Sequence, residues 1–134
     1  MLRLFALLAV LTVAVDSLGF QQSAAVRGVI TCNGSPAGGL KIKLVDHDTF
    51  TPSDRMAEGI TRNDGTFELH GHKSEITGIR PELRVYHRCN RSIVKFWRAC
   101  SKIRIPPQFV SRSAAPDQTF DAGEIRLESM ASNC

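Results

Sequence analysis

The ten residues between Cys89 and Cys100 bring together side chains that suit contact with an anionic surface. They include three basic residues, no acid, the one tryptophan of the chain and three other large apolar residues. Soluble proteins usually keep such apolar groups out of water, so this segment either folds back onto the core or meets a partner. Tryptophan settles at the headgroup depth of a membrane, and lysine and arginine side chains reach toward phosphates. The segment therefore predicts binding to anionic phospholipid.

The basic character extends on both sides of this segment. Residues 80–104 contain eight basic residues and a single acid, Glu82, whereas the whole chain carries a net charge of only +4. Such a concentration of charge favours an anionic partner. The predicted lipid-facing residues are Arg88, Arg91, Lys95, Phe96, Trp97, Arg98 and Lys102. An alternative stays open, because Ile93, Val94 and Trp97 have the spacing of one face of a short helix that packs on the core.

Other residue groups were weighed as metal or catalytic sites. The His70-Gly71-His72 segment places two imidazoles close together, and Asp46, Asp48 and Asp54 offer oxygen ligands for calcium. The aspartates lack the spacing of an EF-hand and a closing glutamate, and no Cys/His zinc spacing is present. No ordered pair of serine and histidine for nucleophilic catalysis is identifiable. We read these residues as polar surface and predict a non-enzymatic protein without metal or cofactor.

The N-terminus has the pattern of a secretory signal peptide. After Arg3, the chain is apolar from Leu4 to Val15, with one interruption at Thr12, and small and polar residues follow. A short basic start, an apolar middle and a small-residue exit define such a peptide, and the apolar run is too short to span a bilayer. We predict a signal peptide over residues 1–19 and a secreted, extracellular domain over residues 20–134. Secretion disfavours a nucleic-acid partner, despite the basic charge.

Four cysteines lie in the predicted mature chain: Cys32, Cys89, Cys100 and Cys134. An even number of cysteines in a small secreted domain indicates disulfides. We therefore predict two disulfide bonds. From the residues alone, all three possible pairings stay open.

The mature sequence has the alternation typical of β-strands. In residues 40–46 apolar and basic side chains alternate, so that Leu40, Ile42 and Leu44 are expected to face inward. The dipeptide Asp64-Gly65 favours a hairpin turn. The expected strands are 24–32, 40–46, 56–61, 66–71, 81–89, 101–105 and 119–128. About seven short strands separated by turn residues predict an all-β fold, an antiparallel β-sandwich.

Several local patterns, taken in order, resemble the nematode transthyretin-like family of secreted proteins. They are Val26-Arg27-Gly28 leading to Cys32 and Pro36, Leu44-Val45-Asp46-His47-Asp48, residues 63–69, residues 83–89, Cys100 with Ile105-Pro106, and residues 120–127 before a terminal cysteine. The resemblance covers nearly all of the mature chain. It implies a transthyretin-like, or prealbumin-like, sandwich of two sheets.

The same resemblance implies a disulfide pairing. In that topology the strands before Cys89 and after Cys100 form an antiparallel hairpin, which would bring these two thiols together. The first and last strands run side by side and parallel, which would bring Cys32 and Cys134 together. The resemblance thus predicts Cys89–Cys100 and Cys32–Cys134, with Cys32–Cys89 as the alternative.

For function, the resemblance implies recognition of phosphatidylserine on dying cells and bridging to a phagocyte receptor. Enzymatic relatives of transthyretin end in Tyr-Arg-Gly-Ser, whereas this chain ends in residues 129–134, Ser-Met-Ala-Ser-Asn-Cys. The alternative is a secreted signalling ligand or carrier that binds a cell-surface receptor without lipid. The oligomeric state is not predicted.

Two sequons are candidates for N-glycosylation. Asn33-Gly34-Ser35 precedes Pro36, which disfavours modification, and Asn90-Arg91-Ser92 lies in the basic segment itself. A glycan on Asn90 would require an exposed base of the loop and would hinder close contact with a bilayer.

Overall fold

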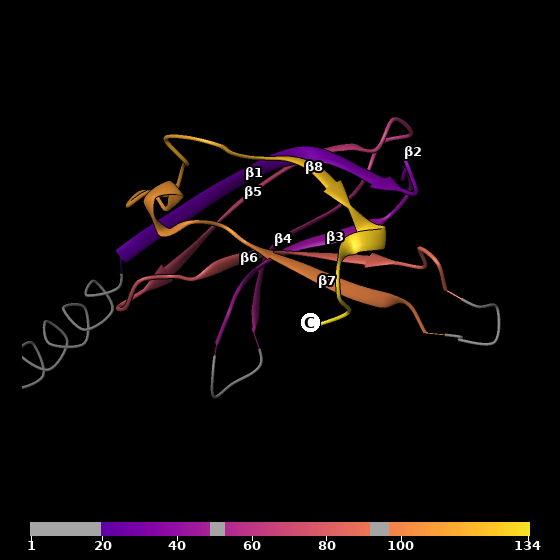
Figure 1. Cartoon of the computed structure of the whole chain (residues 1–134). Coiled ribbons are helices and arrows are strands. Elements are labelled where there is room, and N and C mark those ends of the chain that lie inside the picture. Colours follow the sequence, from indigo (N-terminus) through magenta and orange to yellow (C-terminus); the bar gives the residue numbers. More distant parts are fainter. Residues whose placement is uncertain (1–19, 49–52, 92–96) are drawn as a thin grey trace, which may run out of the picture.

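The alternating residues form two β-sheets that lie face to face (Figure 1). The structure is a computed structural model and describes residues 20–48, 53–91 and 97–134. Sheet A contains β1 (Phe20–Cys32), β2 (Ser35–Pro36), β5 (Thr66–Glu75) and β8 (Phe120–Arg126). Sheet B has the order β4 (Asp54–Ile60), β3 (Lys41–Asp46), β6 (Pro81–His87) and β7 (Ala99–Arg104). Two short 3-10 turns, η1 (Pro107–Phe109) and η2 (Leu127–Ser129), flank β8.

Each of the seven expected strands is present, and the two-residue β2 makes eight in the described part of the chain. The first and last strands, β1 and β8, pair in parallel as expected. The strands on either side of the basic segment, β6 and β7, form the expected antiparallel pair. The all-β sandwich is therefore confirmed. The predicted signal peptide, residues 1–19, lies outside the described residues.

The core lies between the two sheets and is built by side chains at alternate strand positions. Ile30 of β1 meets Ile42, Leu44, Leu83 and Val85 of sheet B, and each of the five is at most 1% exposed. Burying one such side chain contributes roughly 1.5–3 kcal/mol. Because side chains alternate along a strand, the charged residues between these positions must lie on the outer face of sheet B.

One glycine holds the turn between β4 and β5 against the neighbouring strand. Gly65 has a φ of +80°, and a Cβ atom at this position would lie 2.4 Å from the carbonyl oxygen of Ile30. The carbonyl of Gly65 accepts a hydrogen bond of 2.8 Å from the Ile30 N–H. This turn therefore has room only for glycine.

The disulfide pairing implied by the family resemblance is wrong. The structure contains the bonds Cys32–Cys89 and Cys100–Cys134, with Cα–Cα distances of 5.8 and 5.4 Å. The first bond joins the end of β1 to the residues just after β6. The second joins β7 to the C-terminus of the chain. Both bonds thus connect sheet A, or the segment that follows it, with sheet B.

The strand register explains why the hairpin cysteines do not pair. Cys100 lies opposite Tyr86, and side chains opposite each other in an antiparallel pair share one face of the sheet. Tyr86 is on the outer face, whereas Cys89 packs against the core cluster. The two thiols therefore point to different sides of sheet B, although β6 and β7 are neighbours.

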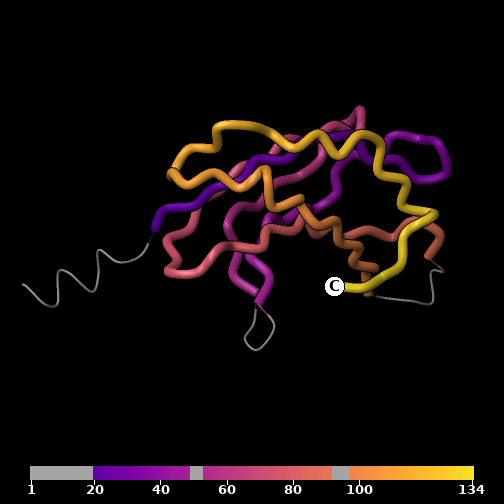
Figure 2. The backbone as a smooth tube through the Cα atoms, turned by 60° about the vertical axis from the view of Figure 1, so that its left-hand side comes forward, coloured from indigo at the N-terminus to yellow at the C-terminus, as the bar shows by residue number. Residues whose placement is uncertain are grey.

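The C-terminal segment explains the second bond. After β8 the chain turns through η2 and crosses from sheet A to the free edge of β7 (Figure 2). There the N–H of Asn133 donates to the carbonyl of Cys100 at 2.8 Å, and the Ser101 hydroxyl donates to the carbonyl of Ala131 at 2.9 Å. Cys134 therefore reaches Cys100 rather than the end of β1.

Candidate functional site

The outer face of sheet B carries a row of three cations on three adjacent strands. Lys43 of β3 lies opposite Arg84 of β6, and Arg84 lies opposite Lys102 of β7. Neighbouring strands are about 4.8 Å apart, and like charges directly opposite each other destabilise a sheet. We call Lys43, Arg84 and Lys102 the basic row. Its charge repulsion falls when an anion lies across it.

The acids near the basic row are largely occupied by other partners. Glu58 lies opposite Lys43 but forms ion pairs with Lys41 at 2.9 Å and Arg55 at 2.7 Å. The hydrogen bond from Lys41 lowers the pKa of the Glu58 carboxyl, so it stays charged and bound to these partners. Among the described residues, neither Lys43 nor Lys102 forms an ion pair.

An aromatic ring extends the row toward the loop. The ammonium of Lys43 lies 5.3 Å from the centroid of the Tyr86 ring, and the guanidinium carbon of Arg98 lies 5.6 Å from it. These are cation–π distances, and at an exposed site such a contact contributes about 0.5–1 kcal/mol. Tyr86 therefore places Arg98, a predicted lipid-facing residue, beside the basic row.

The predicted lipid-facing residues fall into three groups. Arg98 and Lys102 lie on or beside the basic row, and Trp97 is 62% exposed just before them. The exposure of Trp97 answers the alternative in which it packs on the core. Arg88 and Arg91 lie in the turn after β6, where the N–H of Arg91 donates to the carbonyl of Arg88 at 3.0 Å. The remaining predicted positions, Lys95 and Phe96, lie outside the described residues, as do Ile93 and Val94.

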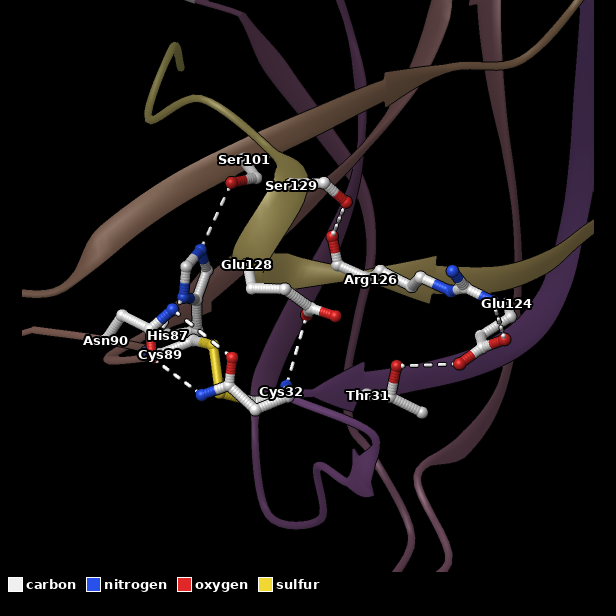
Figure 3. The surroundings of a disulfide bond; sticks show 11 residues. Thr31, Cys32, His87, Cys89, Asn90, Ser101, Glu124, Arg126, Glu128 and Ser129 are labelled. Atoms are coloured by element: carbon white, nitrogen blue, oxygen red, sulfur yellow. Dashed lines mark hydrogen bonds and ion pairs between the residues drawn. A yellow bond between two sulfur atoms is a disulfide. The ribbon is translucent and has the colours of Figure 1, made fainter.

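The base of the loop is held by the Cys32–Cys89 disulfide and a buried histidine (Figure 3). The Cys89 N–H donates to Nδ1 of His87 at 3.1 Å, so Nε2 carries the ring proton and donates to the Ser101 hydroxyl at 3.1 Å. Burial, and then the charge of Arg91, lowers the pKa of His87. A neutral imidazole therefore joins β6, the disulfide and β7.

The two candidate glycosylation sites meet beside this disulfide (Figure 3). The Asn33 side-chain amide donates to the side-chain oxygen of Asn90 at 2.7 Å. Both residues are exposed and have positive φ values of 51° and 57°. The exposure that glycosylation requires is thus present at both asparagines. Their modification stays a prediction.

The residues considered as metal ligands have other partners. The ammonium of Lys73 lies between Asp46 and Asp54, and its distance to the Asp46 carboxylate is 3.1 Å. Burial lowers the pKa of Lys73, but hydrogen bonds from Asp54, Glu75 and Asp46 outweigh it, so the net shift is upward. In residues 20–48, 53–91 and 97–134 no three His, Cys, Asp or Glu side chains gather as metal ligands do.

Sequence reasoning missed two members of the basic row, Lys43 and Arg84. The alternation of residues 40–46 and 81–89 indicated that both point away from the core. Only the register between β3, β6 and β7 places them in line with Lys102. A further finding concerns size and apolarity, because no helix in the described part of the chain is long and apolar enough to cross a membrane.

Comparisons with known proteins agree with this fold. The sequence pattern of the Transthyretin-like family matches residues 27–106. Transthyretin-like protein 5 of Caenorhabditis elegans is 39% identical over 127 residues, which are 94% of this chain and 91% of that protein. Transthyretin-like protein 2 of the same nematode is 38% identical over 120 residues, covering 85% and 80%. A 9R-lipoxygenase structure from Cyanothece, 17% identical with a TM-score of 0.44, covers 78% of this chain and 16% of its own. Its likeness is too weak to carry an argument.

Proposed function

The chain belongs to the transthyretin-like family, and from this premise we propose that it is a secreted, non-enzymatic protein that binds anionic phospholipid. Phosphatidylserine on cell surfaces is the proposed target. The basic row, with Arg98 and Trp97 beside it, is the proposed contact surface. The observation that carries the proposal is the alignment of Lys43, Arg84 and Lys102 across three strands.

The energetics favour a surface of many phosphates over a single ion. Each lysine or arginine near an anionic leaflet contributes about 1 kcal/mol. Lys43, Lys102 and Arg98 together would then contribute about 3 kcal/mol, a gain that falls as salt is added. The exposed Trp97 adds an apolar group at the depth where tryptophan is enriched in membrane proteins. Lys95 and Phe96 belong to the proposed surface from the sequence alone.

Flotation with liposomes tests the proposal. Vesicles of phosphatidylcholine with and without phosphatidylserine are compared at low and physiological salt. We expect binding only to the anionic vesicles. The double variant Lys43→Gln/Lys102→Gln should bind about 30-fold more weakly at low salt, because two contributions of about 1 kcal/mol are lost.

A matched control removes two cations from the other sheet. Arg27 and Arg126 pair with Asp121 and Glu124 on sheet A. The variant Arg27→Gln/Arg126→Gln changes the net charge by the same amount and should bind almost as wild type does. If both double variants lose binding equally, the net charge and not the basic row governs attachment. If no anionic vesicle is bound, the proposed lipid function is wrong.

The proposal includes a second partner, a phagocyte receptor, so that the protein would bridge a dying cell and a phagocyte. Binding to phagocytes is measured with and without phosphatidylserine-bearing target cells. Bridging predicts that engulfment rises with added protein and that Lys43→Gln/Lys102→Gln lowers this rise. Saturable binding to cells that expose no anionic lipid, unchanged in this variant, would instead support a signalling ligand or carrier.

A further inference from the structure

A buried carboxylate lies next to the basic row without a hydrogen-bond donor. Glu82 is 1% exposed, and neither of its carboxylate oxygens accepts a hydrogen bond from the described residues. Nδ1 of His47 lies 2.8 Å from Oε1, at an angle that is not that of a hydrogen bond, and a guanidinium nitrogen of Arg84 lies 3.6 Å from the same oxygen. The other oxygen, Oε2, has no polar partner. Buried charges in proteins are normally paired and hydrogen-bonded, so this oxygen lacks a donor.

Glu82 lines a pocket of about 270 Å³. Its walls include Ile79, Pro106 and Pro107, and its charged lining includes His47 and Arg104. At about 30 Å³ per water molecule, this volume equals about nine waters and suits a head group rather than a whole lipid.

The pocket is formed by the backbone of two strand ends and is therefore present before a ligand arrives. The His47 N–H donates to the carbonyl of Arg80 at 2.9 Å, and the Arg80 N–H donates to the Asp46 carboxylate at 2.9 Å. The Ile105 N–H donates to the carbonyl of Pro81 at 3.0 Å on the other side. Pre-formed walls reduce the ordering that a small ligand must cause.

The charges in the pocket decide which ligand fits. A simple anion would lie against Glu82 and leave Oε2 without a donor. A simple cation would be repelled by Arg104, which lies opposite Glu82 on β7 and forms no ion pair among the described residues. A zwitterion satisfies both groups, because its ammonium donates to Oε2 while its anionic group faces the arginine.

We propose that the Glu82 pocket binds a small zwitterion in which a primary ammonium lies beside a phosphate or carboxylate. Glu82 and Arg84 are two residues apart on β6, about 6.6 Å along the strand. The ammonium at Glu82 and a phosphate on the basic row therefore lie within one head group. Free phosphorylated amines and the head groups of aminophospholipids share this chemistry. The lipid source rests on the proposed function, whereas the pocket itself does not.

Soluble probes test the pocket directly. O-phosphoserine and its N-acetyl derivative have the same phosphate and carboxylate, but only the first carries an ammonium. Isothermal titration at low salt should show that O-phosphoserine binds at least about tenfold more tightly, as expected for a charged hydrogen bond in a buried site. Equal binding of the two probes would overturn the proposal.

Two variants with the same charge change locate the effect. Glu82→Gln should abolish the preference for the free ammonium, whereas Glu58→Gln, on the same face but outside the pocket, should keep it. Circular dichroism and the unfolding midpoint establish that both variants are folded. Should Glu82→Gln fail to fold, the comparison of the two probes on wild-type protein still decides.

Vesicles separate the two sources of the ligand. Phosphatidylserine and phosphatidylglycerol are each mixed into phosphatidylcholine at equal negative charge. A wild-type preference for phosphatidylserine that Glu82→Gln loses assigns the pocket to the lipid head group, even when the soluble probes bind too weakly to detect. Equal binding to both vesicles, with no selective soluble binding, overturns the inference but leaves the proposed lipid function intact. Selective soluble binding without any vesicle binding refutes the lipid function and supports the pocket.

Discussion

Removing the Cys100–Cys134 bond should cost the domain a large part of its stability. The bond closes a sequence separation of 34 residues, and chain-entropy arithmetic gives about 3.8 kcal/mol at 25 °C for such a loop. The double variant Cys100→Ser/Cys134→Ser also frees the C-terminal segment that covers the edge of β7. A small domain has only about 5–15 kcal/mol to lose, so the effect is readily measured.

Urea unfolding followed by far-ultraviolet circular dichroism, under reversible conditions, measures this loss. Two further double variants act as controls. Cys32→Ser/Cys89→Ser removes the other bond, with a separation of 57 residues, and should cost about 4.2 kcal/mol. Cys89→Ser/Cys100→Ser removes one partner from each bond and should lose both contributions, about 8 kcal/mol, if they add.

The three variants also test the connectivity. If the bonds were Cys89–Cys100 and Cys32–Cys134, Cys89→Ser/Cys100→Ser would be the mildest of the three. A cost below about 1 kcal/mol for Cys100→Ser/Cys134→Ser would refute the view that this bond constrains the unfolded chain.

Two further predictions follow from individual residues. Lowering the pH from 7.5 to 5.5 should reduce stability, because burial lowers the folded-state pKa of His87 and the unfolded chain therefore binds more protons below about pH 6.5. Chemical denaturation at both pH values should show this loss in wild type and in His72→Gln but a smaller one in His87→Gln. Gly65→Ala should destabilise by at least about 2 kcal/mol, because it adds a clash to a positive φ, whereas Gly34→Ala, with a φ of +84° in open space, should cost about 1 kcal/mol. Equal losses in thermal or urea unfolding of the two glycine variants would contradict the role of the Ile30 contact.

The strands were predictable from the sequence because their signal is local. Ile42 and Leu44 alternate with lysines, and Leu83 and Val85 alternate with charged or polar residues, so the facing of each strand follows from its own residues. The parallel pairing of β1 and β8 came from the family resemblance rather than from any local pattern.

The disulfides and the basic row depended on relations between distant segments. Cys100 faces outward because Tyr86 lies opposite it, and no pattern near Cys100 contains that register. The path of residues 130–134 has no periodicity from which it could be predicted. Lys43 and Arg84 were both recognisable as outward, but their alignment with Lys102 required the order of three strands.

Glu82 shows the limit of reasoning from charge counts. As the single acid among eight bases in residues 80–104, it is expected to be an exposed, neutralised side chain. It is instead buried beneath the residues that follow β3, where His47 approaches it. Its burial depends on how the ends of β3 and β6 come together, which a linear sequence does not contain.

Both stems of the basic loop are covalently tied to the opposite layer of the sandwich. Cys89, before the loop, is joined to β1, and Cys100, after it, is joined to the C-terminal segment that follows β8. A pulling force applied to the loop is therefore carried through two covalent links into both layers. The β6–β7 ladder does not bear this load alone, so β7 cannot be peeled from the sheet edge one hydrogen bond at a time. The loop is mechanically part of the whole sandwich, although its sequence describes only a hairpin connection.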